Sequence, residues 1–392
     1  MPARVSIEGS MALALAAKVA KVDVVAAYPI TPQTHVIEYL SEFAAKGELD
    51  AECINVESEH SAMSACIGAS ATGARVFTAT SSQGLALMHE LLFIASGSRF
   101  PIVMGVANRA LSSPISIWCD HGDTMAERDS GWIQIYTESC QEIFDSALQA
   151  FKISENREVL LPTMVCFDGF FLSHIVEPAV VLDESEVGNF LPPFEPRYVL
   201  DPEKPLTMGG VGPPQYYYEF RRQQEEAMAK ALRVIKEVCE EYGTLFGRRY
   251  DLLEEYRCYD ADLLLVTIGS MTGNARVAID RLRADGQKVG LIKLRVYRPF
   301  PREAIRAAIK SSKVVAVVER AFGPGSYGGP VFNEIRATMY EEKERPIINS
   351  YIVGLGGRDV TVEDLIEISK KALAIAKTGY AGYGYEFYGV RE

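Results

Sequence analysis

Short apolar strands separated by longer helical stretches are the feature that most constrains the fold of this 392-residue chain. The first half predicts largely apolar strands at Val22–Ala27, Glu52–Val56, Arg75–Thr80, Pro101–Val106 and Leu160–Cys166. Helices are expected between them, over residues 33–46, from residue 59 onward and over residues 85–96. Such strands are typical of a parallel sheet covered by helices on both faces, so the pattern predicts an α/β protein.

The same pattern resumes after an irregular stretch in the middle of the chain. Residues 190–220 contain two Pro-Pro pairs and several glycines, and a charged helix is expected over residues 220–241. Further strands are predicted at 262–268, 289–293 and 314–318, with helices at 274–285 and 302–310. We therefore expect a first domain over residues 1–240, which includes the irregular excursion, and a second over 255–392. The glycine- and aromatic-rich end at 379–388 is expected to form an arm lying on another surface.

Composition narrows the classes of function. Acidic residues outnumber basic ones by 52 to 40, the formal charge is −12, and no basic stripe marks a nucleic-acid surface. No apolar run approaches the ~18 residues that a membrane helix needs, and the start lacks the features of a signal peptide. The seven cysteines are scattered without a Cys-x-x-Cys pair, which argues against a zinc ribbon or a cysteine-bound cluster in this chain. A reduced, cytoplasmic protein is expected.

Polar residues follow several predicted strands at the point where each strand ends. They lie at 28–31, at Glu59, at 81–84 and at 107–109. Ligands of open parallel sheets usually bind beyond the carboxyl ends of the strands. These segments are therefore the first candidates for a functional site.

Each candidate has a structural and a functional interpretation. Thr31 either caps a helix that has Pro32 at its first position, or holds an anionic group with its hydroxyl and the adjacent amides. Glu59 is either a carboxylate favoured by the helix dipole or a poorly solvated group packed against a helix of small residues. Arg109 either forms a salt bridge or binds a carboxylate in bidentate fashion.

Two further motifs carry weaker signals. The run Asp120-His121-Gly122-Asp123 does not have the spacing of a known metal site, and a hydrogen-bonded loop is favoured, so no metal ligand is predicted. The glycine-rich run at 323–330 precedes a predicted helix at 331–340, which makes it a candidate for binding phosphate. It lacks the lysine of a Walker loop and the spacing of a dinucleotide-binding fingerprint.

Taken together, the motifs resemble one family, the α subunits of 2-oxoacid:ferredoxin oxidoreductases, to which pyruvate synthase belongs. The resemblance spans essentially the whole chain and keeps the order of the motifs. The matching segments are YPITP at 28–32, ESEHSAMSA at 57–65, TSSQGL at 80–85, ANRALSSPISIWCDHGDTMAERDSGWIQ at 107–134, CFDGFFLSH at 166–174 and IKLRVYRPFP at 292–301.

The resemblance implies a fold and a set of partners. A pyrimidine-binding thiamine-diphosphate domain would be followed by a domain like the C-terminal domain of transketolase. In such a complex, a β subunit carries the diphosphate-binding Gly-Asp-Gly motif with its Mg²⁺, γ and δ or equivalent subunits carry [4Fe–4S] clusters, and ferredoxin receives the electrons. This chain has no such Gly-Asp-Gly motif, since Phe167-Asp168-Gly169 does not fit it, and no clustered cysteines.

The resemblance also implies roles for individual residues. Glu59 would hydrogen-bond the aminopyrimidine ring of thiamine diphosphate and so take part in catalysis. Thr31 and Arg109 would hold the carboxylate of the substrate. The remaining expected contacts are Ser82 and Gln83 to the cofactor, and Tyr28 and Ile30, with the 112–117 segment, to the substrate side chain.

The implied activity is oxidative decarboxylation of a 2-oxoacid, with pyruvate favoured, to acyl-CoA and CO₂, with coenzyme A as co-substrate. Phenylglyoxylate and branched-chain 2-oxoacids are alternative substrates. A transketolase or 1-deoxyxylulose-phosphate synthase type and a non-catalytic scaffold paralogue are the competing interpretations. The lack of a Gly-Asp-Gly motif argues against a single-chain enzyme of the transketolase type.

Overall fold

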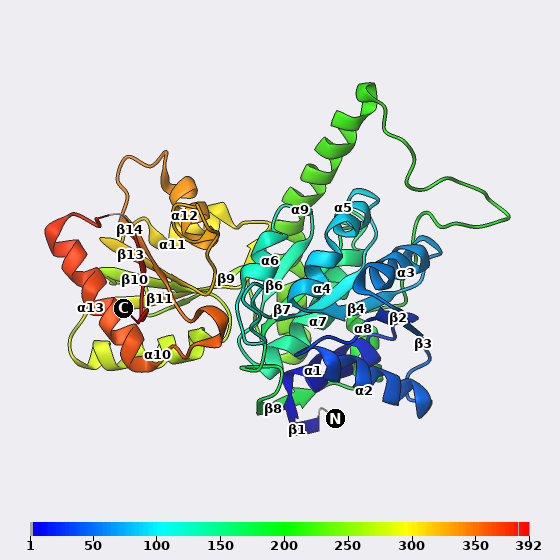
Figure 1. Cartoon of the computed structure of the whole chain (residues 1–392), viewed down its shortest axis with the longest axis horizontal. Helices are drawn as coiled ribbons and strands as arrows, with labels where there is room; N and C mark the ends of the chain where they lie inside the picture. Colours follow the sequence, from blue (N-terminus) through cyan, green and yellow to red (C-terminus); the bar gives the residue numbers. More distant parts are fainter. Residues whose placement is uncertain (1–2, 383, 392) are drawn as a thin grey trace.

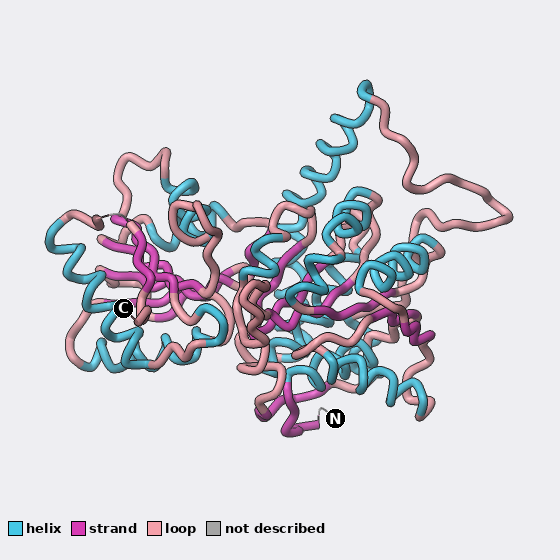
Figure 2. The backbone as a smooth tube through the Cα atoms, viewed as in Figure 1, coloured by secondary structure: helices cyan, strands magenta, loops and turns pink. Residues whose placement is uncertain are grey.

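The computed structural model describes residues 3–382 and 384–391, and the chain folds into two lobes (Figure 1). Strands form the centre of each lobe and helices cover them (Figure 2). Among the described residues, no helix is both long and apolar enough to cross a membrane.

The larger lobe is built on a seven-stranded sheet of order β12-β6-β7-β5-β4-β2-β3. All neighbours are parallel except β12, which runs antiparallel to β6, so the predicted parallel sheet is confirmed. The strands are β2 (Val24–Ala27), β3 (Glu52–Asn55), β4 (Val76–Thr80), β5 (Val103–Asn108), β6 (Ile133–Tyr136), β7 (Thr163–Asp168) and β12 (Val296–Arg298).

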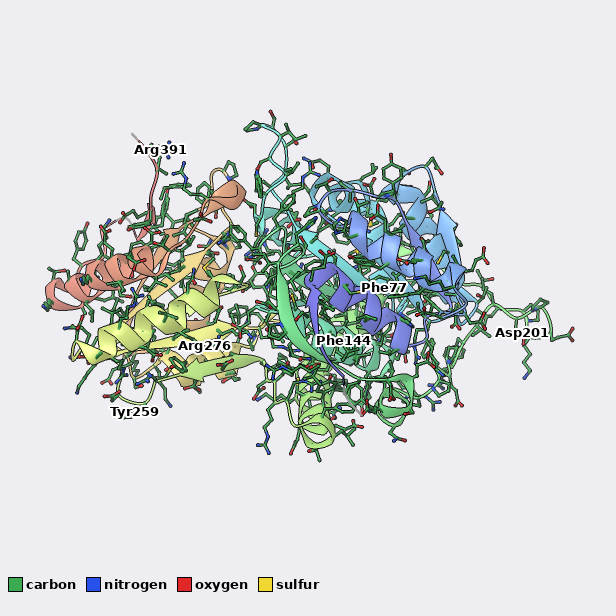
Figure 3. The ribbon with its side chains drawn as sticks, turned by 90° about the horizontal axis from the view of Figure 1, so that it is seen from below. Phe77, Phe144, Asp201, Tyr259, Arg276 and Arg391 are labelled. Carbon is green, nitrogen blue, oxygen red and sulfur yellow. The ribbon has the colours of Figure 1, made fainter. Side chains whose placement is uncertain are left out.

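Helices pack on both faces of this sheet because its strands are buried on both sides. One apolar cluster joins one face to α1 (Gly9–Val19), α2 (Thr34–Ala45) and α7 (Cys140–Glu155), and includes Phe77 and Phe144. Both side chains lie inside the larger lobe in Figure 3. The other face packs against α3 (Glu59–Ala71), α4 (Ser82–Leu87) and α5 (His89–Gly97).

The expected single helix over 85–96 is wrong in its start and its continuity. The helical turn already begins at Ser82 in α4, and α5 starts separately at His89. Met88 is the residue between them, and its backbone amide donates to the carbonyls of Gly84 and Leu85. Ser82, Gln83 and Gly84, which precede the expected helix, therefore form the first turn of α4.

The middle of the chain projects from the larger lobe. Strands β1 (Ala3–Glu8) and β8 (Val176–Val181) form an antiparallel pair. Helix α8 (Glu184–Phe190) follows β8 and is itself followed by an irregular stretch, whose outer part carries Asp201 (Figure 3). Helix α9 (Pro214–Phe246) then returns to the lobe. The expected excursion to residue 220 is thus too long, because α9 begins with Pro214 in its first turn.

The smaller lobe contains a six-stranded sheet of order β15-β14-β13-β10-β11-β9. Helices α10 and α13 share one core cluster with it, whereas α11 and α12 belong to the cluster that continues into the larger lobe. The elements are β9 (Leu253–Tyr256), β10 (Leu263–Thr267), α10 (Met271–Ala284), β11 (Val289–Leu294), α11 (Arg302–Ile309), β13 (Val314–Glu319), α12 (Pro330–Met339), β14 (Ile347–Ile352), η1 (Leu355–Gly357), α13 (Val362–Thr378) and β15 (Tyr385–Phe387).

The end of the chain is not an arm on another surface. Strand β15 pairs in parallel with β14 and becomes the edge strand of the smaller lobe's own sheet. Tyr385 and Phe387 pack there against Phe322. Residue 383, which belongs to the expected arm, lies outside the described residues.

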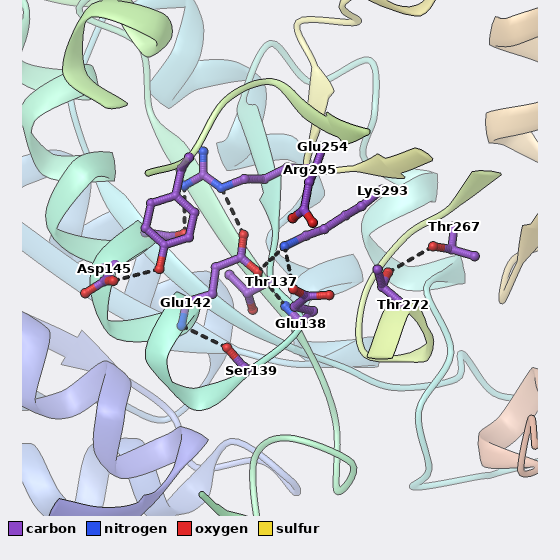
Figure 4. A network of polar contacts seen from close by, with 12 residues as sticks. Thr137, Glu138, Ser139, Glu142, Asp145, Glu254, Thr267, Thr272, Lys293 and Arg295 are labelled. Atoms are coloured by element: carbon purple, nitrogen blue, oxygen red, sulfur yellow. Dashed lines mark hydrogen bonds and ion pairs between the residues drawn. The ribbon is translucent and has the colours of Figure 1, made fainter. Parts of the chain in front are cut away.

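A buried ionic network fastens the two lobes where β11 leads into β12. Glu142 of α7 accepts hydrogen bonds from Lys293 at 2.6 Å and from Arg295 at 3.0 Å (Figure 4). Lys293 also pairs with Glu138 at 3.1 Å. Lys293 and Arg295 lie two residues apart on the segment that leaves the sheet of the smaller lobe at β11 and joins the sheet of the larger lobe at β12. Their bonds to Glu142 therefore hold this connection in place.

Candidate functional site

The candidate residues gather at one edge of the first sheet. Strands β5, β4, β2 and β3 are neighbours in the sheet and run parallel, so their carboxyl ends lie along the same edge. The segments after these strands begin at Arg109, Ser81, Tyr28 and Val56, and the last of them leads to Glu59 at the start of α3. The sequence-based expectation that these loops share one edge is confirmed.

Glu59 is held at the start of α3 by local capping. Ser58 adopts an extended backbone and its hydroxyl accepts a hydrogen bond from the amide of Ser61. The Glu59 side chain is only 6% exposed, and among the described residues it has no hydrogen-bond partner. A carboxylate in this position is unusual, because burial without a donor is costly.

Glycine is required at residue 84 by the approach of Glu59. A Cβ placed on Gly84 would lie 2.5 Å from Glu59 Oε1 and 2.5 Å from Thr80 Oγ1. The Thr80 hydroxyl is buried and has no partner within the described part of the chain. The floor of the site is thus formed by the Glu59 carboxylate and the Thr80 hydroxyl, which have no partner among the described residues, and by the backbone of Gly84 next to both of them.

Ser82 and Gln83 connect this floor to the next loop. Ser82 has a positive φ of 48°, and its hydroxyl donates to the carbonyl of Ala110 at 2.6 Å. The amide group of Gln83 donates to the hydroxyl of Ser112. The turn after β4 is therefore tied to the loop after β5 by two side chains that were expected to face the cofactor.

Thr31 and Arg109 are in direct contact. The guanidinium of Arg109 donates from Nη1 to the backbone carbonyl of Thr31 at 2.9 Å and from Nε to the carbonyl of Ser116 at 3.2 Å. Burial lowers the pKa of Arg109, and nearby Asp123 opposes that change. No described residue accepts a hydrogen bond from Nη2, so that part of the guanidinium is free to bind a ligand.

Thr31 does not cap α2. The helix begins at Thr34 with Gln33 as the residue before it, and neither Thr31 nor Pro32 is helical. The Gln33 side chain instead accepts a hydrogen bond from the amide of Ile30 at 3.3 Å. The expectation of Thr31 as N-cap and Pro32 as first helical residue is wrong, because Arg109 holds the Thr31 carbonyl in the loop ahead of the helix.

The residues expected near the substrate side chain are partly or largely exposed to solvent. Tyr28 is 38% exposed and Ile30 is half-buried. Ser112 to Ile117 form a surface loop in which Ile115 is 75% exposed. A cleft of about 950 Å³ adjoins Ser112 and separates it from the glycine-rich loop of the smaller lobe.

Asp123 is a central residue of the site that sequence reasoning did not single out. Its carboxylate lies in α6 (Gly122–Ala126) and accepts hydrogen bonds from the amides of Ser82 and Arg109. Burial raises its pKa to about 6. Its motif was expected to be a hydrogen-bonded loop, but the last two residues of the motif, Gly122 and Asp123, begin helix α6. Nothing in the local sequence indicated which amides Asp123 would bind.

His121, two residues earlier, binds Asp168, which in turn contacts the smaller lobe. Its Nε2 lies 2.8 Å from Asp168 Oδ1, and the other oxygen of Asp168 accepts from the hydroxyl of Ser270 at 2.5 Å. Although burial acts to raise it, the pKa of Asp168 is lowered to about 2 by His121, Arg320 and Ser270. Asp168 is thus fully engaged in a contact between lobes.

Cys119 lies beside His121 and Asp168, and the three ligand atoms are within 4.8 Å of one another. The imidazole nitrogen is already used in the hydrogen bond to Asp168. Burial raises the pKa of the Cys119 thiol, so the thiolate that binds metals is disfavoured. These contacts favour a buried polar lock over a metal centre.

The glycine-rich loop at 323–330 is not an open phosphate cradle. The carboxylate of Glu319, at the end of β13, accepts hydrogen bonds from the amides of Val331 and Phe332 at the start of α12. A Cβ on Gly329 would lie 2.1 Å from this carboxylate. The helix terminus considered for phosphate is therefore already occupied by the carboxyl group of Glu319.

Comparison with known proteins places this chain in a family. The profile described as pyruvate flavodoxin/ferredoxin oxidoreductase, thiamine diphosphate-binding, matches residues 15–240, and that of pyruvate:ferredoxin oxidoreductase core domain II matches 261–365. Pyruvate synthase subunit PorA of Methanocaldococcus jannaschii is 54% identical over 362 residues, which cover 92% of each chain. The chain belongs to the pyruvate:ferredoxin oxidoreductase family.

Other members of the oxidoreductase family are similar over nearly the whole chain. PorA of Methanothermobacter thermautotrophicus is 52% identical, with 93% of this chain and 94% of the relative covered. Ketoisovalerate oxidoreductase subunit VorA of Pyrococcus horikoshii is 47% identical, with 99% and 98% covered. The family resemblance inferred from the motifs is thereby confirmed.

Solved structures support the oxidoreductase fold. The 2-oxoglutarate:ferredoxin oxidoreductase of Magnetococcus marinus superposes with a TM-score of 0.74 at 21% identity over 94% of this chain, which spans 65% of that longer chain. A split-gene transketolase superposes with a TM-score of 0.56 at 13% identity over 95% of this chain and 100% of that one. The expected fold class, a thiamine-diphosphate domain followed by a transketolase-like α/β domain, is confirmed.

Proposed function

We propose that this chain is the α subunit of a multi-subunit oxidoreductase that decarboxylates a 2-oxoacid, pyruvate above all, to acyl-CoA and CO₂. The observation that carries the proposal is the unpartnered, buried Glu59 carboxylate at the same sheet edge as the Arg109–Thr31 pair. The first offers an acceptor for a nitrogen heterocycle, and the second offers a cation for a carboxylate.

The residues present fit thiamine diphosphate. Glu59 and Thr80 have no donor or acceptor from the described residues, and Gly84 leaves the backbone bare between them. We propose that Glu59 holds the pyrimidine end of the cofactor and that Ser82 and Gln83 contact it. When bound, thiamine diphosphate supplies the carbanion and the electron sink that a 2-oxoacid decarboxylation requires.

Glu59 would act as the proton partner of the bound ring. Its carboxylate sits at the first turn of α3, beside the positive end of the helix dipole, in a residue that is only 6% exposed. An ionised carboxylate without a competing donor accepts a hydrogen bond strongly in such a place. Glu59 would therefore orient the ring and favour the tautomer that can move a proton.

Arg109 and Thr31 would hold the substrate carboxylate. The Nη1 and Nε groups of Arg109 are fixed by the carbonyls of Thr31 and Ser116, which orients the guanidinium. Its remaining Nη2 group and the nearby Thr31 hydroxyl are then available to two carboxylate oxygens. This arrangement would place the 2-oxo carbon between the two ends of the site.

Tyr28 and Ile30 are proposed to border the substrate side chain, with the 112–117 loop opposite. Relatives named pyruvate synthase at 52% and 54% identity favour pyruvate. The relative named ketoisovalerate oxidoreductase at 47% identity keeps branched-chain 2-oxoacids as the second candidate. Phenylglyoxylate and a non-catalytic scaffold role have no observation of this kind in their favour.

The partners follow from what this chain lacks. We propose a β subunit that holds the diphosphate and Mg²⁺, iron–sulfur subunits of the γ and δ type with [4Fe–4S] clusters, ferredoxin as acceptor and coenzyme A as co-substrate. Asp168 of the Phe167-Asp168-Gly169 sequence is engaged with His121 and Ser270. A cytoplasmic complex and domains of 1–240 and 255–392 complete the proposal.

An anaerobic pull-down of the tagged chain from its own host tests this function. The eluate is examined by visible spectroscopy and by viologen reduction with pyruvate, 2-oxoisovalerate and phenylglyoxylate. We expect a brown, stoichiometric complex that is most active with pyruvate. A colourless solitary chain without activity would contradict the proposal and favour a scaffold, and preference for another 2-oxoacid would correct the substrate alone.

A further inference from the structure

The carboxylate of Asp123 bonds to two loops that come from different strands. Its Oδ2 accepts from the backbone amide of Ser82 at 3.1 Å and from that of Arg109 at 3.0 Å. Its Oδ1 accepts from the side chain of Asn108 at 2.8 Å and from the amide of Thr124 at 2.8 Å. The residue is only 1% exposed, so these four donors account for its environment.

The two backbone amides belong to opposite ends of the proposed site. Ser82 opens α4, two residues before the glycine that faces Glu59. Arg109 follows β5 and carries the guanidinium that contacts Thr31. A single oxygen of Asp123 therefore sets the spacing between the cofactor side and the substrate side.

We propose that Asp123 is a positioning residue that holds the turn at Ser82 and the backbone of Arg109 in register for the reaction. The proposal rests on the proposed function and goes beyond it, since Asp123 itself touches neither Glu59 nor the Arg109 guanidinium. It acts through the two backbone amides that it accepts from.

A carboxylate suits this task better than any neutral side chain. The four donors need two oxygens with two lone pairs each, which an ionised carboxylate supplies. Burial raises the pKa of Asp123 to about 6, so at pH 8 the group is ionised and accepts all four. Ser82 also has a positive φ of 48°, and a bond to its amide helps to hold that backbone geometry.

Further hydrogen bonds hold α6, the short helix that carries Asp123, against the sheet. Asn108 also donates to the Thr124 hydroxyl at 2.8 Å, and that hydroxyl lies 2.7 Å from the Tyr136 hydroxyl. These contacts fix the short helix that carries Asp123 against β5 and β6. The amides of Ser82 and Arg109 are thus tied to the sheet, not only to each other.

The test compares Asp123→Asn with Asp145→Asn in the assembled complex at pH 8. Asparagine keeps the size but turns one acceptor into a donor that faces an N–H group. Asp145 is an equally buried carboxylate in α7 that binds Tyr242, Tyr250 and Arg248, none of which belongs to the site loops. The control therefore loses a similar network elsewhere.

Two readouts are measured on both variants: the kinetics with pyruvate, and hydrogen exchange of peptides that cover residues 81–87 and 107–112. For Asp123→Asn we expect KM to rise and kcat to fall by at least fivefold each, with faster exchange in both peptides. For Asp145→Asn we expect a lower melting temperature, KM and kcat within twofold, and unchanged exchange in these peptides.

The proposal is overturned if the Asp123→Asn complex assembles with KM and kcat within twofold of the parent, whatever the exchange shows. If that variant does not assemble, Asp123→Ala, which removes both acceptor oxygens without adding a donor, must show the same kinetic and exchange changes. Arg109→Ala and Glu59→Gln are assayed alongside. If these keep full activity the proposed function fails, whereas if only Asp123→Asn keeps it, the positioning role alone fails.

Discussion

Replacing Asp168 with asparagine should loosen the contact between the two lobes. Asp168 accepts from His121 on one oxygen and from the hydroxyl and the amide of Ser270 on the other. Ser270 lies in the smaller lobe, whereas His121 and Asp168, the last residue of β7, lie in the larger one. In asparagine one of these oxygens is replaced by an NH₂ group. Either His121 or Ser270 would then face a donor in place of its acceptor.

The size of the effect follows from the pKa of the buried carboxyl group. His121, Arg320 and Ser270 outweigh the opposing effect of burial and lower the pKa of Asp168 from 3.8 to about 2. A depression of this size stabilises the folded state by about 2 kcal/mol. The contribution is complete above the ordinary pKa and is lost as the pH falls from about 4 through 2, so it is fully present at pH 7.

Calorimetry of the purified chain at pH 7 measures this loss. We expect Asp168→Asn to lower the melting temperature by about 4–8 °C, at about 2–4 °C per kcal/mol for a unit of this size. Asp129→Asn is the control, because Asp129 is 75% exposed and its ion pairs are 3.9 Å long. A fall of less than 1 °C for Asp168→Asn would refute the idea that this contact stabilises the fold.

Three further predictions concern single residues. Arg109→Ala should raise KM for pyruvate by about 10- to 100-fold, because a charge-assisted contact to a carboxylate is lost, and a change below twofold in steady-state assays would rule out its role. Gly84→Ala should abolish turnover without preventing assembly, because its Cβ would lie 2.5 Å from Glu59 Oε1; normal cofactor-dependent activity would contradict that close approach. Glu319→Gln should destabilise the smaller lobe by about 1–3 kcal/mol, because one N–H group of α12 would face an amide donor, and unchanged urea unfolding would contradict this assignment.

The parallel sheet and the gathering of the candidate residues at one of its edges were predictable from the sequence. Apolar strands alternating with helices predicted the order of the layers, and the rule for strand ends brought Glu59, Thr31 and Arg109 to one edge. Both inferences rest on local periodicity and on the parallel direction of neighbouring strands. The observed pairing of β5, β4, β2 and β3 satisfies both conditions.

Contacts between distant segments were not predictable in the same way. The crossing of β12 into the first sheet depends on its pairing with β6, whose residues lie far away in the sequence. Asp123 binds the amide of Ser82, which is 41 residues away, and no local pattern indicates such a partner. The sequence likewise did not show that the start of α12, at residue 330, is already occupied. Glu319 binds there from the end of β13, a separate strand.

The Glu59→Gln complex offers the most direct measurement of the proposed site. It is assembled with its partner subunits and assayed for pyruvate-dependent viologen reduction beside the parent complex. Glutamine keeps the shape of the side chain but removes the ionised acceptor, so we expect turnover to fall at least 100-fold while assembly and the iron–sulfur spectrum stay unchanged. Turnover close to that of the parent would contradict the assignment of Glu59 as the proton partner and, with it, the placement of the reaction at this edge of the sheet.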